Sequence, residues 1–247
     1  LSRVPGELGE AAAVDGAGTF RRFRSVTLPL IAPSVRMVGL LLAFTGGMLD
    51  AYSFVNRGSV FATAETGNIV QLCVHLSMGR WYMAFHYLLP ITAFFLGILS
   101  AEAIRKKVSA HSNWFHWRQF LVAAECLVLV LVSFLPTGEP DWAANVLISF
   151  TSAVQLETFR KFRGCAGATT MCTGNLRSGT ELLYKFLALP DPQSGEKATV
   201  YYRLILGFAL GAILCGRLSL VFGERTALFA CLPLLAIFFL LFKPANE

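Results

Sequence analysis

The chain has 247 residues and a formal net charge of +6, with 55% hydrophobic and only 15% charged residues. A soluble domain usually carries about a quarter charged residues. The shortage of charge and the long apolar runs therefore indicate an integral membrane protein rather than a soluble enzyme. The basic residues lie mostly between apolar runs, where the positive-inside rule expects them. The net charge accordingly predicts no nucleic-acid partner.

Two regions follow from the hydropathy pattern. Residues 1–33 are rich in Gly and Ala and lack the apolar core of a signal peptide, so we expect a flexible cytosolic tail. Residues 34–243 form a single transmembrane domain. Its apolar runs are continuous and have about the 17–25 residues that a spanning helix needs, which predicts an all-α polytopic membrane protein. The runs are 36–56, 59–79, 82–104, 119–136, 142–159, 166–188, 200–222 and 226–242.

An internal repeat relates residues 34–136 to residues 142–243. When Asn68 is aligned with Asn175, the preceding Thr-Gly pairs coincide, and acidic Asp50 falls on acidic Glu157. A ladder of small residues four apart also occurs in both halves, and such ladders let membrane helices approach closely. The predicted packing residues are Ala93, Gly97 and Ala101 in the first half and Gly207, Gly211 and Cys215 in the second.

The basic clusters test the topology of this repeat. They lie in the tail, at 105–118 and at 160–163, whereas the segment "TGEPD" at 137–141 carries only acidic charges. All clusters face the cytosol only if one of the three apolar runs between residues 36 and 105 fails to cross. The polar runs 59–79 and 166–188 are the candidates. This arrangement gives two inverted repeats, with about six spanning helices and two re-entrant or broken helices; the alternative is eight spanning helices with parallel repeats.

The tripeptide Thr-Gly-Asn occurs once in each of the two polar runs. Gly is a poor helix residue and Asn tolerates unusual backbone angles, so each copy predicts a helix break or the start of a half-helix. Two half-helix starts that meet near the membrane midplane are typical of a transport site. The residues predicted to line the substrate or ion pathway are Asp50, Glu65, Thr66, Gly67, Asn68, Glu157, Thr173, Gly174, Asn175, Arg177 and Glu181.

Structural roles for the same residues stay open. Thr and Asn in membrane helices often hydrogen-bond to a neighbouring helix. Arg177 either supplies charge for an anionic substrate or pairs with Glu181, four residues along one helix face. Glu125 and Arg217 are single charges in apolar runs, and each is an ion-pair partner or a substrate ligand.

Four segments, "GGMLDAYSF", "GSVFATAETGNIV", "ETFRKFRG" and "ATTMCTGNLRSGTELLY", resemble the YoaK-like family of bacterial membrane proteins. The likeness extends over residues 34 to 243. The resemblance implies a family of unknown function with about six transmembrane helices, and it supplies no substrate or catalytic residue. Glu65 and Glu157 stand where such sequences often have Gln, which argues against an obligatory proton-carrier role for either carboxylate.

The leading functional prediction is a secondary transporter or channel for a small solute or ion in the bacterial plasma membrane, with a cytosolic N-terminus. The alternatives are a structural or assembly protein and, less favoured, a membrane-embedded enzyme acting on a lipid or quinone. No nucleotide loop, nucleophile elbow or zinc motif occurs in the sequence. We therefore predict no catalytic residue, metal or cofactor; the lipid bilayer is the expected partner, and a homo-oligomer remains open.

Overall fold

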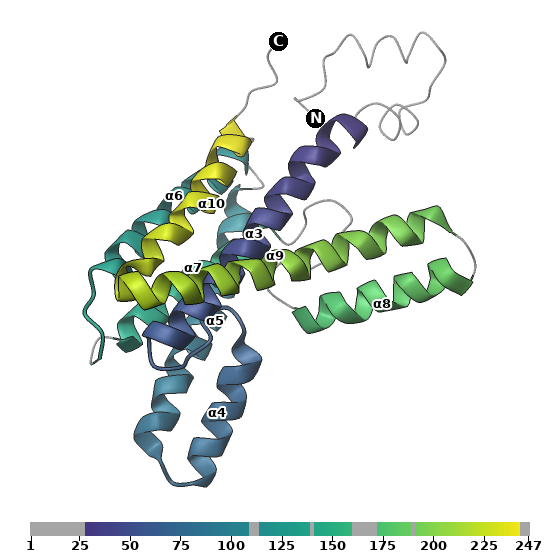
Figure 1. Cartoon of the computed structure of the whole chain (residues 1–247). Helices are drawn as coiled ribbons and strands as arrows, with labels where there is room; N and C mark the ends of the chain where they lie inside the picture. The colour runs from purple at the N-terminus through teal and green to yellow at the C-terminus, as the bar shows by residue number, and fades with distance from the viewer. Residues whose placement is uncertain (1–27, 109–113, 139–140, 160–171, 189–190, 243–247) are drawn as a thin grey trace, which may run out of the picture.

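The computed structural model describes residues 28–108, 114–138, 141–159, 172–188 and 191–242, and these residues form helices and connecting loops without a strand (Figure 1). The all-helical prediction is thereby confirmed for this part of the chain. The helices are α3 (Leu28–Asn56), α4 (Glu65–Ser77), α5 (Trp81–Val108), α6 (Trp114–Ser133), α7 (Asp141–Phe159), α8 (Cys172–Ala188), α9 (Pro192–Phe222), the short 3-10 helix η2 (Gly223–Thr226) and α10 (Ala227–Phe242).

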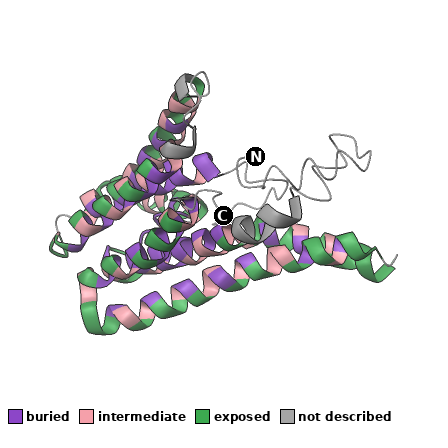
Figure 2. Ribbon diagram, turned by 90° about the horizontal axis from the view of Figure 1, so that it is seen from above, coloured by how far each residue is buried: buried purple, intermediate pink, exposed green. Residues whose placement is uncertain are grey.

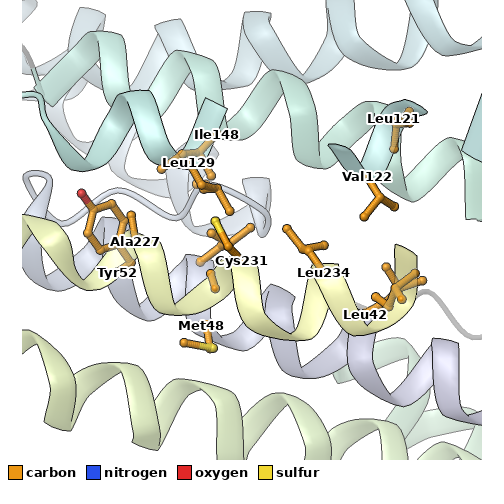
Figure 3. Close-up of a cluster of buried hydrophobic side chains, with 14 of the residues drawn as sticks. Leu42, Met48, Tyr52, Leu121, Val122, Leu129, Ile148, Ala227, Cys231 and Leu234 are labelled. Atoms are coloured by element: carbon orange, nitrogen blue, oxygen red, sulfur yellow. The ribbon is translucent and has the colours of Figure 1, made fainter. Parts of the chain in front are cut away.

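The longer helices pack into one bundle. α3 lies against α9 and α10, α7 lies against α5 and α6, and α6 also contacts α10. Leu42, Leu129, Ile148 and Leu234 are buried where α3, α6, α7 and α10 meet (Figure 3). The apolar core therefore joins helices from both halves of the chain, although each half on its own contributes an incomplete apolar surface.

Glycine sets the closest helix contacts in the bundle. A Cβ added at Gly211 of α9 would lie 2.0 Å from the carbonyl oxygen of Phe44 on α3. A Cβ added at Gly97 of α5 would lie 2.6 Å from the carbonyl oxygen of Phe150 on α7. Small residues at these positions let two backbones touch directly. The remaining predicted packing positions lie on the same helices: Ala93, Ala101 and Cys215 are buried, and Gly207 faces Leu40 of α3.

One end of the bundle is marked by Arg57, the residue after α3. The last turn of α6 lies at this end, as shown by the hydrogen bond from Arg57 to the carbonyl oxygen of Val132 at 2.9 Å. α9 ends there too, since Asn56 Nδ2 donates to Ser219 Oγ at 2.7 Å. α3, α6 and α9 therefore run in the same direction towards the Arg57 end.

Three other helices begin at the Arg57 end. Asp141, the first residue of α7, pairs with Arg57 at 3.0 Å. Tyr52 donates to the carbonyl oxygen of Glu224 at 2.9 Å, just before α10 begins. His86, near the start of α5, lies beside Gly58. α5, α7 and α10 therefore run opposite to α3, α6 and α9.

α4 and α8 lie outside this alternating set. Each folds back as a hairpin, α4 on α5 and α8 on α9, and projects from the bundle (Figure 1). With 13 residues, α4 is about 20 Å long, less than the ~30 Å hydrocarbon core. The run 59–79 is thus not a continuous helix, because α4 begins only at Glu65. Residues 166–171 of the other polar run lie outside the described residues, as do residues 1–27, 160–163 and 243–247.

The ends of two further helices differ from the expected runs. α3 begins at Leu28, inside the range expected to be a tail. α9 begins at Pro192, earlier than residue 200, because Asp191 caps it by accepting from the backbone N–H groups of Gln193 and Ser194. Hydrogen bonds from Ser194 and Gln193 hold the pKa of Asp191 below its usual value. Pro at the first helical position suits this start, since it needs no N–H partner.

The outside of the helices is apolar. Figure 2 shows exposed residues along the outer faces and buried residues towards the middle. Within the described residues, Met37–Asn56, Trp81–Lys106 and Pro192–Leu241 are long and apolar enough to cross a membrane. Phe95, Leu99, Leu206, Ile213 and Phe239 are at least half exposed on these segments. A surface of large exposed apolar side chains on spanning helices belongs in a lipid bilayer.

Candidate functional site

The loop between α3 and α4 is held inside the molecule by side chains of α3. Asp50 Oδ1 accepts the backbone N–H of Thr63 at 2.7 Å, and Ser53 Oγ accepts that of Ala62 at 3.1 Å. Asp50 and Ser53 are themselves buried. Because a buried backbone N–H must find a partner within the protein, these two polar side chains make an irregular loop possible at this position.

Asn68, the last residue of the first Thr-Gly-Asn, completes this support. Its Oδ1 accepts the N–H of Phe61 at 3.0 Å, and its Nδ2 donates to the carbonyl oxygen of Phe61 at 2.6 Å and to Glu65 Oε2 at 2.8 Å. The side chain is fully buried, at 0% exposure. An amide is the one side-chain group that satisfies both backbone groups of a single residue, as a neighbouring strand would.

Replacement of Asn68 by alanine is expected to lower the free energy of unfolding by about 1–3 kcal/mol, because both backbone groups of Phe61 lose their partner in a buried loop. Thermal unfolding of the purified protein in detergent measures this change. Gln71→Ala is the matched control, since Gln71 is an exposed amide one turn further along α4. Equal melting temperatures for both variants would contradict the assigned role of Asn68.

The carboxyl groups of Asp50 and Glu65 lie near this loop, within electrostatic range of each other. One oxygen of each, Asp50 Oδ2 and Glu65 Oε1, is buried without a well-formed hydrogen bond from the described residues, and the Thr63 hydroxyl lies close to the Asp50 carboxylate. Cys172, the first residue of α8, interacts electrostatically with Asp50. We call Asp50, Thr63, Glu65, Asn68 and Cys172 the Asp50 cluster. The start of α4 contributes Glu65 and Asn68 to it, and the start of α8 lies within electrostatic range of Asp50; each start carries Thr-Gly-Asn in its first turn.

Several predicted pathway residues lie away from this cluster. Thr66, Thr173 and Gly174 are exposed, and Gly67 faces the ring of Phe61. The structure does not place these four among the interacting polar groups. Asn68 and Asn175, by contrast, are both buried, because each follows Thr-Gly at the position that turns inward in the first helical turn. Glu157 is also buried, on α7.

Arg177 and Glu181 form an ion pair on the surface of α8. Arg177 Nε lies 3.0 Å from Glu181 Oε1, and the two side chains are 82% and 57% exposed. Of the two roles left open for Arg177, the structure therefore shows the ion pair with Glu181. Neither side chain is brought to the Asp50 cluster, so Arg177 does not supply positive charge there.

Sequence reasoning missed Arg57 as a structural residue. Its guanidinium is fully buried and donates to Tyr52 Oη, to Asp141 Oδ1 and to backbone carbonyl oxygens of Val132, Leu135 and Pro136. These carbonyl groups lie at the end of α6 and in the turn that follows it, where the chain no longer supplies a regular set of helical donors. Arg57 belongs to no polar motif of the sequence, and no local signal reveals a partner 79 residues away.

These features define an all-helical membrane protein in which two short helices begin at a buried carboxyl cluster. The family described as "Protein of unknown function (DUF1275)" matches residues 38–240, and the chain belongs to this family. UPF0700 transmembrane protein YoaK of Bacillus subtilis is 28% identical over 142 residues, which are 56% of this chain and 62% of that protein. The resemblance to YoaK-like proteins is thus confirmed.

Shorter similarities connect the chain to permeases. Diacetylchitobiose uptake system permease protein NgcF of Streptomyces coelicolor is 50% identical over 55 residues, 22% of this chain and 15% of that protein. The sn-glycerol-3-phosphate transport system permease protein UgpA of Escherichia coli O157:H7 is 51% identical over 68 residues, 26% of this chain and 22% of that protein. The chain thus spans about three fifths of YoaK and less than a quarter of these permeases. No solved structure gives a significant match.

Proposed function

We propose that the chain is a secondary transporter or channel for a small solute, and that its binding site is the Asp50 cluster. The observation that carries this proposal is a pair of buried carboxyl groups at the start of α4, Asp50 and Glu65, which have no cationic partner among the described residues and whose Oδ2 and Oε1 oxygens lack a well-formed hydrogen bond there. Burying a polar group without a partner is costly, so such groups in a membrane protein mark an ion or substrate pathway.

Two inverted repeats form the framework of this proposal. The repeat pairs each helix of the first half with one of the second half: α3 with α7, α4 with α8, α5 with α9 and α6 with α10. The observed helix contacts follow the same pairing. The contact of α3 with α9 corresponds to that of α7 with α5, and the contact of α4 with α5 corresponds to that of α8 with α9. The exchanged helices of the bundle also run in opposite directions, as their contacts at the Arg57 end require. These relations support six spanning helices with α4 and α8 re-entrant, a pattern found in transporters.

A cation is the favoured solute. The described groups of the Asp50 cluster are carboxyl, amide, hydroxyl and thiol, and neither carboxyl group pairs with a described Lys or Arg. Arg177, the residue expected to attract an anion, lies on the exposed face of α8. Carboxylate and neutral oxygens suit a metal cation or a protonated amine, and a bound proton would equally neutralise the pair.

We place this protein in the bacterial plasma membrane with its N-terminus in the cytosol. Arg105 and Lys106 lie at the far end of α5 from the Arg57 end, and the acidic residue Asp141 lies at the Arg57 end. The positive-inside rule then puts the Arg57 end outside. NgcF is a permease protein of an uptake system and UgpA is a permease protein of a transport system. These short similarities give transport some additional support.

Asp50→Asn is expected to lower cation flux at least about tenfold, because the amide keeps an oxygen for the Thr63 N–H but loses the charge that offsets a bound cation. Purified protein in proteoliposomes is to be screened with alkali and alkaline-earth cations and small protonated amines. Thr92→Ala is the matched control, since Thr92 is exposed on α5 and bonds only to its own helix.

Flux that is equal in the wild type, in Asp50→Asn and in Thr92→Ala would remove the Asp50 cluster from the mechanism. A folded wild-type protein without flux for any cation, while small anions pass, would overturn the proposed solute class. The absence of flux for every solute would favour the structural or assembly role over transport.

A further inference from the structure

A line of polar residues follows one face of α7 into the bundle. Asp141, Asn145, Ser149, Ser152 and Gln155 are spaced by four, four, three and three residues, which keeps them on adjacent parts of one helix face. From Asp141 to Gln155 the line is about 21 Å long at the usual helical rise. We call these five residues the α7 polar line.

The α7 polar line is buried over nearly all its length. Asp141, at the Arg57 end, retains 14% side-chain exposure, whereas Asn145, Ser149, Ser152 and Gln155 are at most 4% exposed. The line therefore starts next to the outside of the bundle and ends in its interior. Apolar residues would be expected on such a face, since a fully buried helix gains most from apolar packing.

The hydroxyl groups of the α7 polar line have no hydrogen-bond partner among the residues that the structure describes. Serine and threonine in helices commonly donate to the carbonyl oxygen four residues back, and Thr151 does so to Leu147 at 2.8 Å. Ser149 Oγ, Ser152 Oγ and Asn145 Oδ1 make no such bond, although they are buried. Buried polar groups normally bind protein groups or ordered water, so these three atoms are the positions at which water would bind along the line.

The inner end of this line is a carboxyl group. Gln155 Nε2 donates to Glu125 Oε2 of α6 at 2.6 Å, and Glu125 Oε1 is buried without a partner. Glu125 is 1% exposed and lies one turn from Leu129 in the apolar core (Figure 3). The Cys231 thiol of α10 lies within electrostatic range of Glu125 and donates to the backbone carbonyl oxygen of Cys126, the next residue of α6, at 3.7 Å. No described Lys or Arg forms an ion pair with it.

We infer that Glu125 and Gln155 form a buried proton-binding site, which exchanges its proton with the Arg57 end of the bundle through water bound along the α7 polar line. An isolated carboxylate in an apolar core is strongly disfavoured, whereas a protonated carboxyl group is neutral and donates a hydrogen bond from one oxygen. The partnerless Oε1 is the oxygen available for that proton, since Oε2 already accepts from Gln155. This site does not share a described residue with the Asp50 cluster, and it does not depend on the proposed transport.

Infrared difference spectroscopy of the full-length protein in lipid bilayers tests this inference directly. The carbonyl stretch of a protonated carboxyl group should be present at neutral pH, diminish as the pH is raised and shift on transfer to deuterium oxide. Glu125→Gln should remove this band, and Asp50→Asn should leave it, because Asp50 belongs to the other cluster. The inference is overturned if Glu125→Gln removes no protonated-carboxyl band, or if the Glu125 band neither titrates nor exchanges.

The path is tested by the rate of deuterium exchange at the same band. The double variant Ser149→Ala with Ser152→Ala should slow this exchange by about tenfold or more, the effect expected when a bound water loses about one hydrogen bond. Thr151→Ala is the matched control, because Thr151 lies on the same helix and already bonds to its own backbone. Exchange as fast in the double variant as in the control would exclude the α7 polar line as the path.

Discussion

Replacement of Arg57 by alanine is expected to lower the free energy of unfolding by about 3–5 kcal/mol, the cost of leaving a buried charge and its acceptors without a partner. The guanidinium is 0% exposed and joins the end of α3 to the end of α6 and the start of α7. Its removal takes the charged partner from Asp141 and a donor from the carbonyl oxygens of Val132, Leu135 and Pro136. Reversible unfolding in mixed micelles, followed by tryptophan fluorescence, measures the loss.

A second arginine gives the matched control for this prediction. Arg177 also forms an ion pair at 3.0 Å, but its side chain is 82% exposed, so Arg177→Ala should cost less than about 0.5 kcal/mol. Arg57→Lys should give an intermediate loss, because lysine keeps the charge but cannot present the planar set of donors. Similar losses for Arg57→Ala and Arg177→Ala would show that the buried network does not stabilise the bundle.

Replacement of Gly211 by alanine is expected to destabilise the protein by about 1–3 kcal/mol or more, because the added methyl group meets backbone rather than a movable side chain. The Cβ would lie 2.0 Å from the carbonyl oxygen of Phe44, so α3 and α9 would have to separate. The melting temperature in detergent should fall, and the loss should be larger for bulkier replacements.

Gly216 of the same helix supplies a control for which the expected change in stability has the opposite sign. A Cβ added there meets no atom within 4 Å, so Gly216→Ala should stabilise the protein by about 0.5–1 kcal/mol through helix propensity alone. Two glycines five residues apart on α9 thus separate the packing effect from the intrinsic effect of the residue. Destabilisation by both substitutions to the same extent would contradict the close contact of α3 with α9.

The two polar runs, 59–79 and 166–188, show which residues of the candidate site the sequence could predict. The sequence singled out Thr-Gly-Asn because Gly and Asn disfavour a continuous helix, and both copies do lie in the first turn of a short helix. It grouped Thr66, Asn68, Thr173 and Asn175 as equivalent ligands. Only the two asparagines are buried, since the facing direction of a side chain depends on where the helix begins and on what packs against it.

Ser53 and Thr63 show why the rest of the site was not predictable. Neither residue belongs to a motif, and serine or threonine is common in membrane helices. Their importance comes from a loop that folds back against α3, so that Ser53 meets Ala62 and Asp50 meets Thr63. A hydrogen bond between residues 9 to 13 positions apart across an irregular loop has no sequence period that reveals it.

By itself the sequence determined the class of this protein and its all-helical nature, and it singled out small residues at which helices could approach closely, but it misplaced the starts of several helices. Those properties depend on local composition: apolar runs of spanning length partition into lipid, and a glycine permits close contact wherever it lies. Only the tertiary structure decided which charges are buried. Arg57 and Arg177 each lie close to an apolar segment, yet one joins three helices and the other faces outward, because burial of a charge requires acceptors supplied by distant parts of the chain.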